Sequence, residues 1–137
     1  MTTKSSGFNL IELLVVVVIL GILSGVGILT YNGYISGTKQ KSAENAMQQI
    51  SLAQTEEYSN SGEYFTQEDG GSCVPSSTTS AAIETALFGG GDVISEDGGY
   101  EMCISEDGSS YSVVASAGTG KCTITMTANG VWTREDC

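Results

Sequence analysis

The chain has 137 residues, enough for one compact domain with a projecting helix. Sixteen acidic residues against five basic ones give a net charge of −11, so the surface lacks the Lys and Arg clusters that nucleic-acid binding requires. The sequence contains no histidine, which removes the most common general base and metal ligand. We therefore expect no enzyme, no metal site and no cofactor.

The N-terminus changes abruptly from polar to apolar sequence. Residues 1–7 form a polar leader with one basic residue, Lys4, and the stretch from Phe8 to Leu29 is almost entirely apolar. A helix over this stretch would rise roughly 33 Å, enough to cross a bilayer core. Glu12 is the one carboxylate inside it. Since a carboxylate among lipid-facing residues costs about 2.5–3.5 kcal/mol, a plain membrane anchor gains nothing from Glu12.

Gly7 followed directly by Phe8, then by Glu12 and an apolar helix, resembles the class III signal peptide of type IV pilins. The resemblance covers the N-terminal helix, and the rest of the chain fits only in outline. It implies cleavage between Gly7 and Phe8, N-methylation of Phe8, and a charge pair in the assembly between Glu12 and the Phe8 amine of a neighbouring subunit. An ordinary secretory signal, with a small-residue site at Leu23-Ser24-Gly25, and a plain anchor remain the alternatives.

Glycines recur along the apolar helix. Gly21 and Gly25 form a GxxxG pair, and Gly33 and Gly37 form a second. Glycines at this spacing let helices approach closely in lipid, and each weakens a helix by up to about 1 kcal/mol relative to alanine. We assign Gly21 and Gly25 to assembly, with local unwinding or simple tolerance as alternatives. Pilins commonly carry proline where Leu29 stands, so unwinding would depend on the glycines alone.

The helical pattern continues in amphipathic form over residues 38–62. Apolar side chains recur at a three-to-four spacing, and polar ones occupy the other faces. The apolar positions are Ala43, Ala46, Met47, Ile50 and Ala53, and the polar positions include Lys39, Lys41, Glu44, Gln48, Gln49 and Glu56. Stop signals occur at Ser59–Gly62. A helix from Phe8 to this point would be roughly 78 Å long, which membrane anchoring followed by bundling would explain.

Residues 63–137 are expected to form a globular head that begins with a loop and a short helix. The loop covers the polar segment Glu68–Thr79, which Cys73 would pin. Ser80 would cap a helix over Ala81–Leu87, ended by a glycine run. Three acidic residues follow, Asp92, Glu96 and Asp97. We interpret them as solvated loop carboxylates rather than as a calcium site.

Alternating sequence in the last third predicts an antiparallel sheet of three or four strands. The candidates are Tyr100–Ser105, Ser110–Ser116, Lys121–Thr127 and Val131–Thr133. In the third candidate Cys122, Ile124 and Met126 would face the helix, with threonines on the other side. Asn129-Gly130 is a strong hairpin signal. The predicted fold class is therefore α+β: a long N-terminal helix packed against a small antiparallel sheet in a disulfide-stabilised head.

Four cysteines follow the apolar helix: Cys73, Cys103, Cys122 and Cys137. An even number in an exported chain predicts two disulfides, and the close pairs typical of zinc sites are missing from the sequence. Four cysteines allow three pairings. The spacing favours Cys122–Cys137 with Cys73–Cys103, the resemblance favours the same choice because pilin-like heads commonly close with a C-terminal pair, and the other two pairings stay open.

The resemblance implies a structural subunit of a type IV pilus. The precursor would sit in the inner membrane through helix 8–37, lose leader 1–7, and polymerise with identical subunits into an extracellular filament on the bacterial surface. The implied partners are a prepilin peptidase, an inner-membrane platform protein and an assembly ATPase. A pseudopilin of a type II secretion system, a minor pilin and, more remotely, a monomeric membrane-anchored binding domain are the alternatives.

Overall fold

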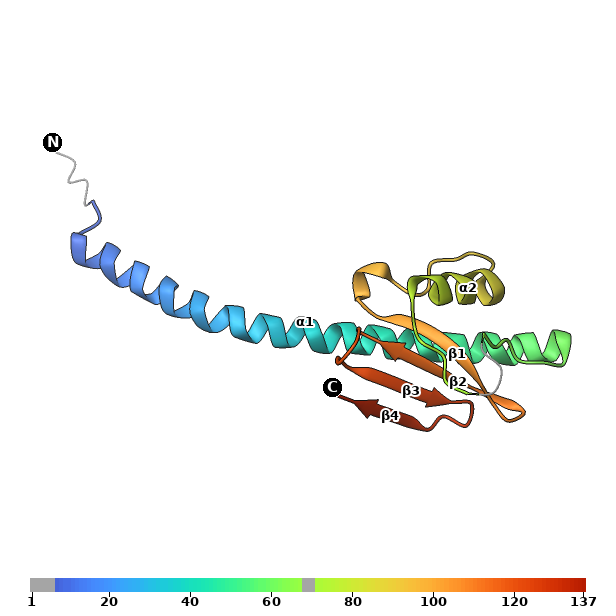
Figure 1. Ribbon diagram of the computed structural model, residues 1–137. Coiled ribbons are helices and arrows are strands. Elements are labelled where there is room, and N and C mark those ends of the chain that lie inside the picture. Colours follow the sequence, from blue (N-terminus) through green and yellow to red (C-terminus); the bar gives the residue numbers. More distant parts are fainter. Residues whose placement is uncertain (1–6, 68–70) are drawn as a thin grey trace. The chain divides into compact units, whose positions relative to one another are not determined.

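The computed structural model describes residues 7–67 and 71–137, and the chain divides into two compact units, Met1–Gly37 and Thr38–Cys137 (Figure 1). The elements in chain order are α1 (Leu10–Ser61), α2 (Ser77–Phe88), a 3-10 helix (Glu96–Gly98), β1 (Glu101–Asp107), β2 (Ser110–Ser116), β3 (Thr123–Thr127) and β4 (Trp132–Glu135). The strands form one antiparallel sheet in the order β1-β2-β3-β4. The α+β prediction of a long N-terminal helix and a small antiparallel sheet is confirmed.

The two ends of α1 are set by local signals. The helix begins at Leu10 and not at Phe8, because the Asn9 side chain accepts a hydrogen bond from the Leu10 N–H at 3.1 Å and so occupies the position before the first turn. At the other end the helix stops at Ser61, within the predicted stop signals. Gly62 has φ +83°, a left-handed conformation that glycine adopts without strain.

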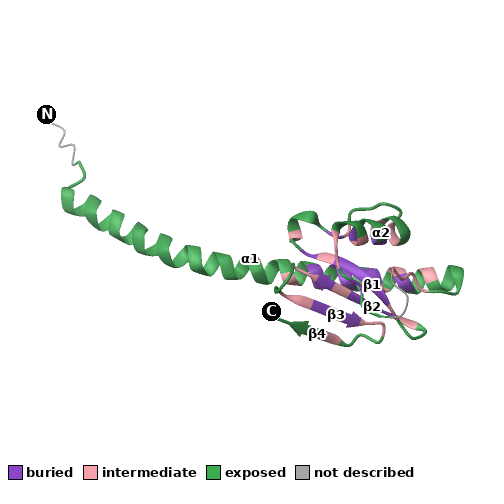
Figure 2. Cartoon of the chain, in the orientation of Figure 1, coloured by how far each residue is buried: buried purple, intermediate pink, exposed green. Residues whose placement is uncertain are grey.

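The core of the second unit lies between α1 and one face of the sheet. The predicted helix face is buried at Ala43, Ala46, Met47 and Ile50, and Ala53 is half-buried. Strand burial alternates along β2 and β3, as expected for a sheet with one covered face, and Figure 2 shows these buried positions. The strands contribute Met102, Ile104, Tyr111, Val113, Ala115, Ile124 and Met126 to this core.

Glu44 departs from the prediction that it lies on the polar side of α1. Its residue is only 7% exposed, and its carboxylate accepts hydrogen bonds from Arg134 Nε at 2.7 Å and Lys41 Nζ at 3.0 Å. The bond from Arg134 is the main reason that the pKa of Glu44 lies below its usual value, against a rise caused by burial. The ion pair joins α1 to β4. The packing of the helix against the sheet, which we predicted from apolar residues alone, therefore also includes the charged residue Glu44.

The second helix begins earlier than predicted. Ser76, and not Ser80, caps it: Ser76 Oγ accepts from the Thr79 N–H at 3.2 Å, and Thr79 Oγ1 accepts from the Ser76 N–H at 2.8 Å. The predicted helix over Ala81–Leu87 is therefore Ser77–Phe88. The predicted loop loses its last three residues to this helix, and its positions 68–70 lie outside the described residues.

Ser80 instead helps to close the outer edge of β1. The Met102 N–H donates to Ser80 Oγ at 3.0 Å, and Thr79 Oγ1 donates to the Met102 carbonyl at 2.7 Å. Gln67 closes the next position, because it exchanges hydrogen bonds with Ile104 N–H and C=O at 3.0 and 2.9 Å. An open sheet edge is a template for unwanted strand pairing, and side chains and a loop backbone cover this one.

The strand boundaries differ from the predictions by a few residues. Strand β1 begins after Tyr100 and extends to Asp107. Strand β3 starts at Thr123, since Lys121 and Cys122 belong to the preceding turn, and β4 covers Trp132–Glu135 instead of Val131–Thr133. Pairing in the sheet sets these limits, and alternation alone does not mark where pairing stops.

Two disulfides cross-link the second unit. Cys73–Cys103 joins the loop before α2 to β1, with a Cα–Cα distance of 6.1 Å, and both cysteines are buried. Cys122–Cys137 joins the residue before β3 to the end of the segment after β4, with a Cα–Cα distance of 4.4 Å. Cys122 is half-buried and Cys137 is exposed. The two bonds therefore differ in how easily a reductant reaches them.

Mild reduction is expected to open Cys122–Cys137 before Cys73–Cys103, because only the first has an exposed sulfur-bearing residue. Its loss should loosen β4 at a cost of roughly 2–4 kcal/mol. Alkylation of the chain during graded reduction, followed by peptide mass analysis, measures the order. Labelling of Cys73 and Cys103 at the same reductant concentration as Cys122 and Cys137 would contradict it.

Glu44→Gln should lower the free energy of unfolding by about 1–2 kcal/mol at neutral pH, since a charged hydrogen bond is lost and Arg134 is partly solvated. The pKa of Glu44 is lower in the folded chain, so its contribution is present above the unfolded value and disappears as the pH falls through the folded one. Thermal unfolding in detergent across pH measures this. The exposed Glu56→Gln serves as control, and a Glu44→Gln difference that persists in acid would refute the account.

Candidate functional site at the N-terminal helix

The Gly7–Phe8 peptide bond lies in exposed, non-helical backbone ahead of α1. Phe8 is 86% exposed, so neither residue is held by packing within the chain. Exposed backbone outside secondary structure is where proteases cut most readily, because it enters an active site without unfolding. The predicted processing residues therefore occupy a segment that a peptidase can reach.

Glu12 lies in the first turn of α1 and takes part in capping it. Its Oε2 accepts the Asn9 N–H at 3.1 Å, while Asn9 Oδ1 accepts the Leu10 N–H. A carboxylate here also interacts favourably with the positive end of the helix dipole. Within a single chain Glu12 is thus held by its own helix start, and its side chain stays at the surface.

Asn9 is the functional candidate that the sequence reasoning missed. The spacing Asn9-x-x-Glu12 before an apolar run is a capping-box signal, and it was available in the sequence. It fixes where the helix starts, which leaves Gly7 and Phe8 outside the helix.

The first part of α1 exposes apolar side chains all the way round. An 18-residue window of α1 has a mean hydropathy of 2.8 and none of it is buried, so by length and composition the helix is able to cross a membrane. Figure 2 shows the same exposure along the first unit. An apolar surface of this extent marks a contact with lipid or protein.

The glycines of the GxxxG pairs face open space. A Cβ placed on Gly21, Gly25, Gly33 or Gly37 would meet nothing within 4 Å. Nothing inside the described chain therefore requires glycine at these positions. The hydroxyls of Ser24 and Thr30 donate to helix carbonyls at 2.7 and 3.1 Å, so these polar groups are satisfied without water.

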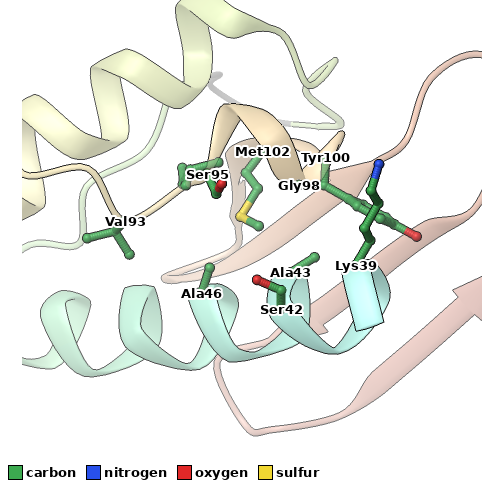
Figure 3. Close-up of a pocket in the computed structure, with 10 residues that line it drawn as sticks. Lys39, Ser42, Ala43, Ala46, Val93, Ser95, Gly98, Tyr100 and Met102 are labelled. Atoms are coloured by element: carbon green, nitrogen blue, oxygen red, sulfur yellow. The ribbon is translucent and has the colours of Figure 1, made fainter. Parts of the chain in front are cut away.

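The second unit offers little that resembles a catalytic centre. Among the described residues no group of three or more His, Cys, Asp or Glu side chains is placed to hold a metal ion. A cavity of about 10 Å³ between α1 and the segment before β1 is lined by Ala43, Ala46, Tyr100 and Met102, with Lys39 at its rim (Figure 3). It has space for about one water, too little for a substrate. Burial there raises the pKa of Tyr100.

Comparison with known families identifies the N-terminal segment. Residues 2–28 match the prokaryotic N-terminal methylation motif, which is the class III signal peptide of type IV pilins and pseudopilins. The fold is pilin-like as well, with a long N-terminal helix, a four-stranded antiparallel sheet and two disulfides. Proteins with this motif are structural and not enzymatic. Comparisons with curated proteins and with solved structures give no match.

Proposed function

We propose that this chain is the structural subunit of a type IV pilus. The precursor enters the inner membrane through the apolar part of α1, a prepilin peptidase cuts between Gly7 and Phe8 and methylates Phe8, and the mature chain polymerises into an extracellular filament. An assembly ATPase and an inner-membrane platform protein supply the work of extraction. The observation that carries the proposal is the methylation motif at the start of α1, whose apolar 18-residue window is wholly exposed.

Assembly replaces lipid contacts on the apolar helix by contacts with identical helices. The hydrophobic effect alone does not favour this exchange, because lipid tails are as apolar as the side chains. Specific pairing must therefore select the arrangement. The open surfaces at Gly21 and Gly25 allow close helix approach, and Glu12 offers a charge within the apolar region.

Glu12 finds a partner of opposite charge only after cleavage. Removal of leader 1–7 turns Phe8 into a free N-terminus, whose amine has a reference pKa near 8 and is mostly charged at neutral pH. A neighbouring subunit then presents this amine to Glu12. In an apolar filament core either charge alone would be costly, so the pair fixes the register between subunits.

A pseudopilin of a type II secretion system and a minor pilin carry the same N-terminal motif, and they are the second candidates. All three share the processing and the membrane-spanning precursor. They differ in whether long surface filaments contain this chain as the main component. A monomeric membrane-anchored binding domain would remain in the inner membrane.

The direct test is N-terminal and intact-mass analysis of material sheared from the cell surface. We expect a chain that begins with N-methyl-Phe8, abundant in filaments, with a mass reduced by the hydrogens lost in two disulfides. A processed chain that is scarce or missing in sheared filaments indicates a minor pilin or a pseudopilin. A chain that starts at Met1 and stays in the membrane would refute the proposal.

Glu12→Gln separates the two roles of this residue. Glutamine keeps an oxygen that accepts the Asn9 N–H but loses the charge, whereas Glu12→Ala loses both. We expect both variants to reduce incorporation into filaments by about tenfold or more, because each leaves the Phe8 amine unpaired in the core. The sheared fraction of each variant measures this. Near-normal filaments with Glu12→Gln would show that capping, and not charge, is what matters.

Gly25→Ala tests close helix packing, with Gly27→Ala as the matched control. Both substitutions add a methyl group into open space within one chain, and each should stabilise the helix by up to about 1 kcal/mol. Only Gly25 belongs to the Gly21–Gly25 pair. We expect fewer or more fragile filaments with Gly25→Ala alone. Equal defects in both variants would instead indicate that the helix must unwind here.

A further inference from the structure

The second unit has two distinct ends along the direction of α1. Ser51 Oγ lies 3.0 Å from the Tyr111 hydroxyl, near the β1–β2 turn, and Glu44 binds Arg134, which pairs with Ile124. These contacts align α1 with the sheet. We call the end with the β1–β2 turn and the C-terminus of α1 the distal end, and the end with Thr38 and the β2–β3 turn the proximal end (Figure 1).

A groove lies at the distal end between the last turn of α1 and the β1–β2 turn. Its volume is about 440 Å³. The last turn of α1 and the segment after it contribute Tyr58, Glu63 and Tyr64, and the strand side contributes Glu106 and the residues of the turn. No basic residue lines the groove.

Two stacked tyrosines form one wall of this groove. Tyr58 and Tyr64 stack with ring centroids 4.6 Å apart, and Tyr64 meets the buried Tyr111 edge-on at 4.8 Å. Tyr58 remains 48% exposed, so it presents its ring to whatever enters. Aromatic faces next to carboxylates attract a cation through both the ring and the charge. The groove of Glu63, Glu106 and the tyrosines therefore suits an ammonium group.

The basic residues of the described chain are confined to the other end of the unit. They are Lys39, Lys41, Lys121 and Arg134. Acidic residues occur at both ends, whereas the distal residues Glu56, Glu57, Glu63, Glu106 and Asp107 have no basic neighbour at that end. A molecule with its bases at one end and a cation-binding groove at the other is complementary to a copy of itself.

All four bases are exposed, and Lys121 is the one that lies in a turn of the sheet at the proximal end. Lys41 and Arg134 are bound to Glu44, and Lys39 lines the small cavity beside Tyr100. Lys121 lies in the exposed β2–β3 turn and has no ion pair within the described residues. The groove of the same chain is out of its reach, since the helix from Thr38 to Ser61 rises roughly 36 Å.

We propose that the distal groove binds Lys121 of a second copy of this chain. Such a contact joins different surfaces of identical molecules, so it does not close on itself as a two-fold dimer does and repeats along a row. It rests on the proposed filament function and adds to it a contact between heads. It also counters the repulsion between acidic subunits by placing one cation of each copy against the acidic end of the next.

Zero-length coupling of amines to carboxylates tests this contact on the full chain, in sheared filaments and in membranes. We expect a dimer in which a peptide with Lys121 is joined to one with Glu63 or Glu106. Lys39 is the internal comparison and should not join to either. If the chain is in filaments and the Lys121 crosslink is found, the inference is supported. If the chain is in filaments without this crosslink, the inference is overturned while the filament function stands. If the chain is found only in membranes, the filament function is wrong. In that case a Lys121 crosslink in the membrane sample still supports the contact, and its absence overturns the contact as well.

Variants show whether the contact uses charge and ring. Lys121→Glu and Glu63→Lys should each lower recovery of the chain in filaments by about fivefold, and the double exchange should restore it. Lys39→Glu is the matched control and should behave as wild type. Tyr58→Phe should keep the Lys121 crosslink and Tyr58→Ala should weaken it, since only alanine removes the ring. No rescue by the double exchange, or an equal loss with Lys39→Glu, would overturn the assignment.

Discussion

The exposed apolar part of α1 is the constraint on which the rest of this structure depends. A helix with apolar side chains on every face is unfavourable in water, so this segment requires contact with lipid or with protein. The capping of Leu10 by Asn9, the carboxylate of Glu12 and the open glycines all lie in this part of the helix. The methylation motif coincides with this segment.

The second unit is small, and its stability depends on more than its hydrophobic core. Its hydrophobic core is modest, and three other devices support it: two disulfides, the Glu44–Arg134 ion pair and the closure of the β1 edge by Gln67, Thr79 and Ser80. Edge closure matters because an open edge strand is a template for pairing with another chain. Polar side chains thus cover the hydrogen-bonding groups of the β1 edge that another strand would otherwise bind.

Periodicity in the sequence was sufficient to predict the architecture. Apolar spacing at Ala43, Met47 and Ile50 indicated the packed helix face, and alternation around Val113 and Ile124 indicated the sheet. In the N-terminal part, Glu12 stands out as a charge inside an apolar run. These signals are local, so they can be recognised in the sequence without knowledge of the tertiary contacts.

Features that depend on distant partners could not be predicted in this way. The sequence predicts Glu44 as a surface residue, because its partner Arg134 is far along the chain and only the fold brings the two together. Ser76 and Ser80 are equally good caps by residue type, and only the bond between Ser80 and Met102 shows that the second is used elsewhere. Both cases concern polar groups, whose roles are fixed by the geometry of their partners and not by hydrophobicity. The same is true of the distal groove, since Tyr58 and Tyr64 are far along the chain from Glu106 and the β1–β2 turn, which line its other side.

The central claim is that identical copies cover the apolar helix and that Glu12 selects their arrangement. The most direct measurement is the distance between the Phe8 amine nitrogen of one subunit and the Glu12 carboxylate of its neighbour, in a high-resolution electron-microscopy structure of sheared filaments. The account predicts apolar helices bundled in the filament core, with this distance within about 4 Å. Helices bundled with Glu12 facing solvent, or filaments that do not contain this chain, would contradict it.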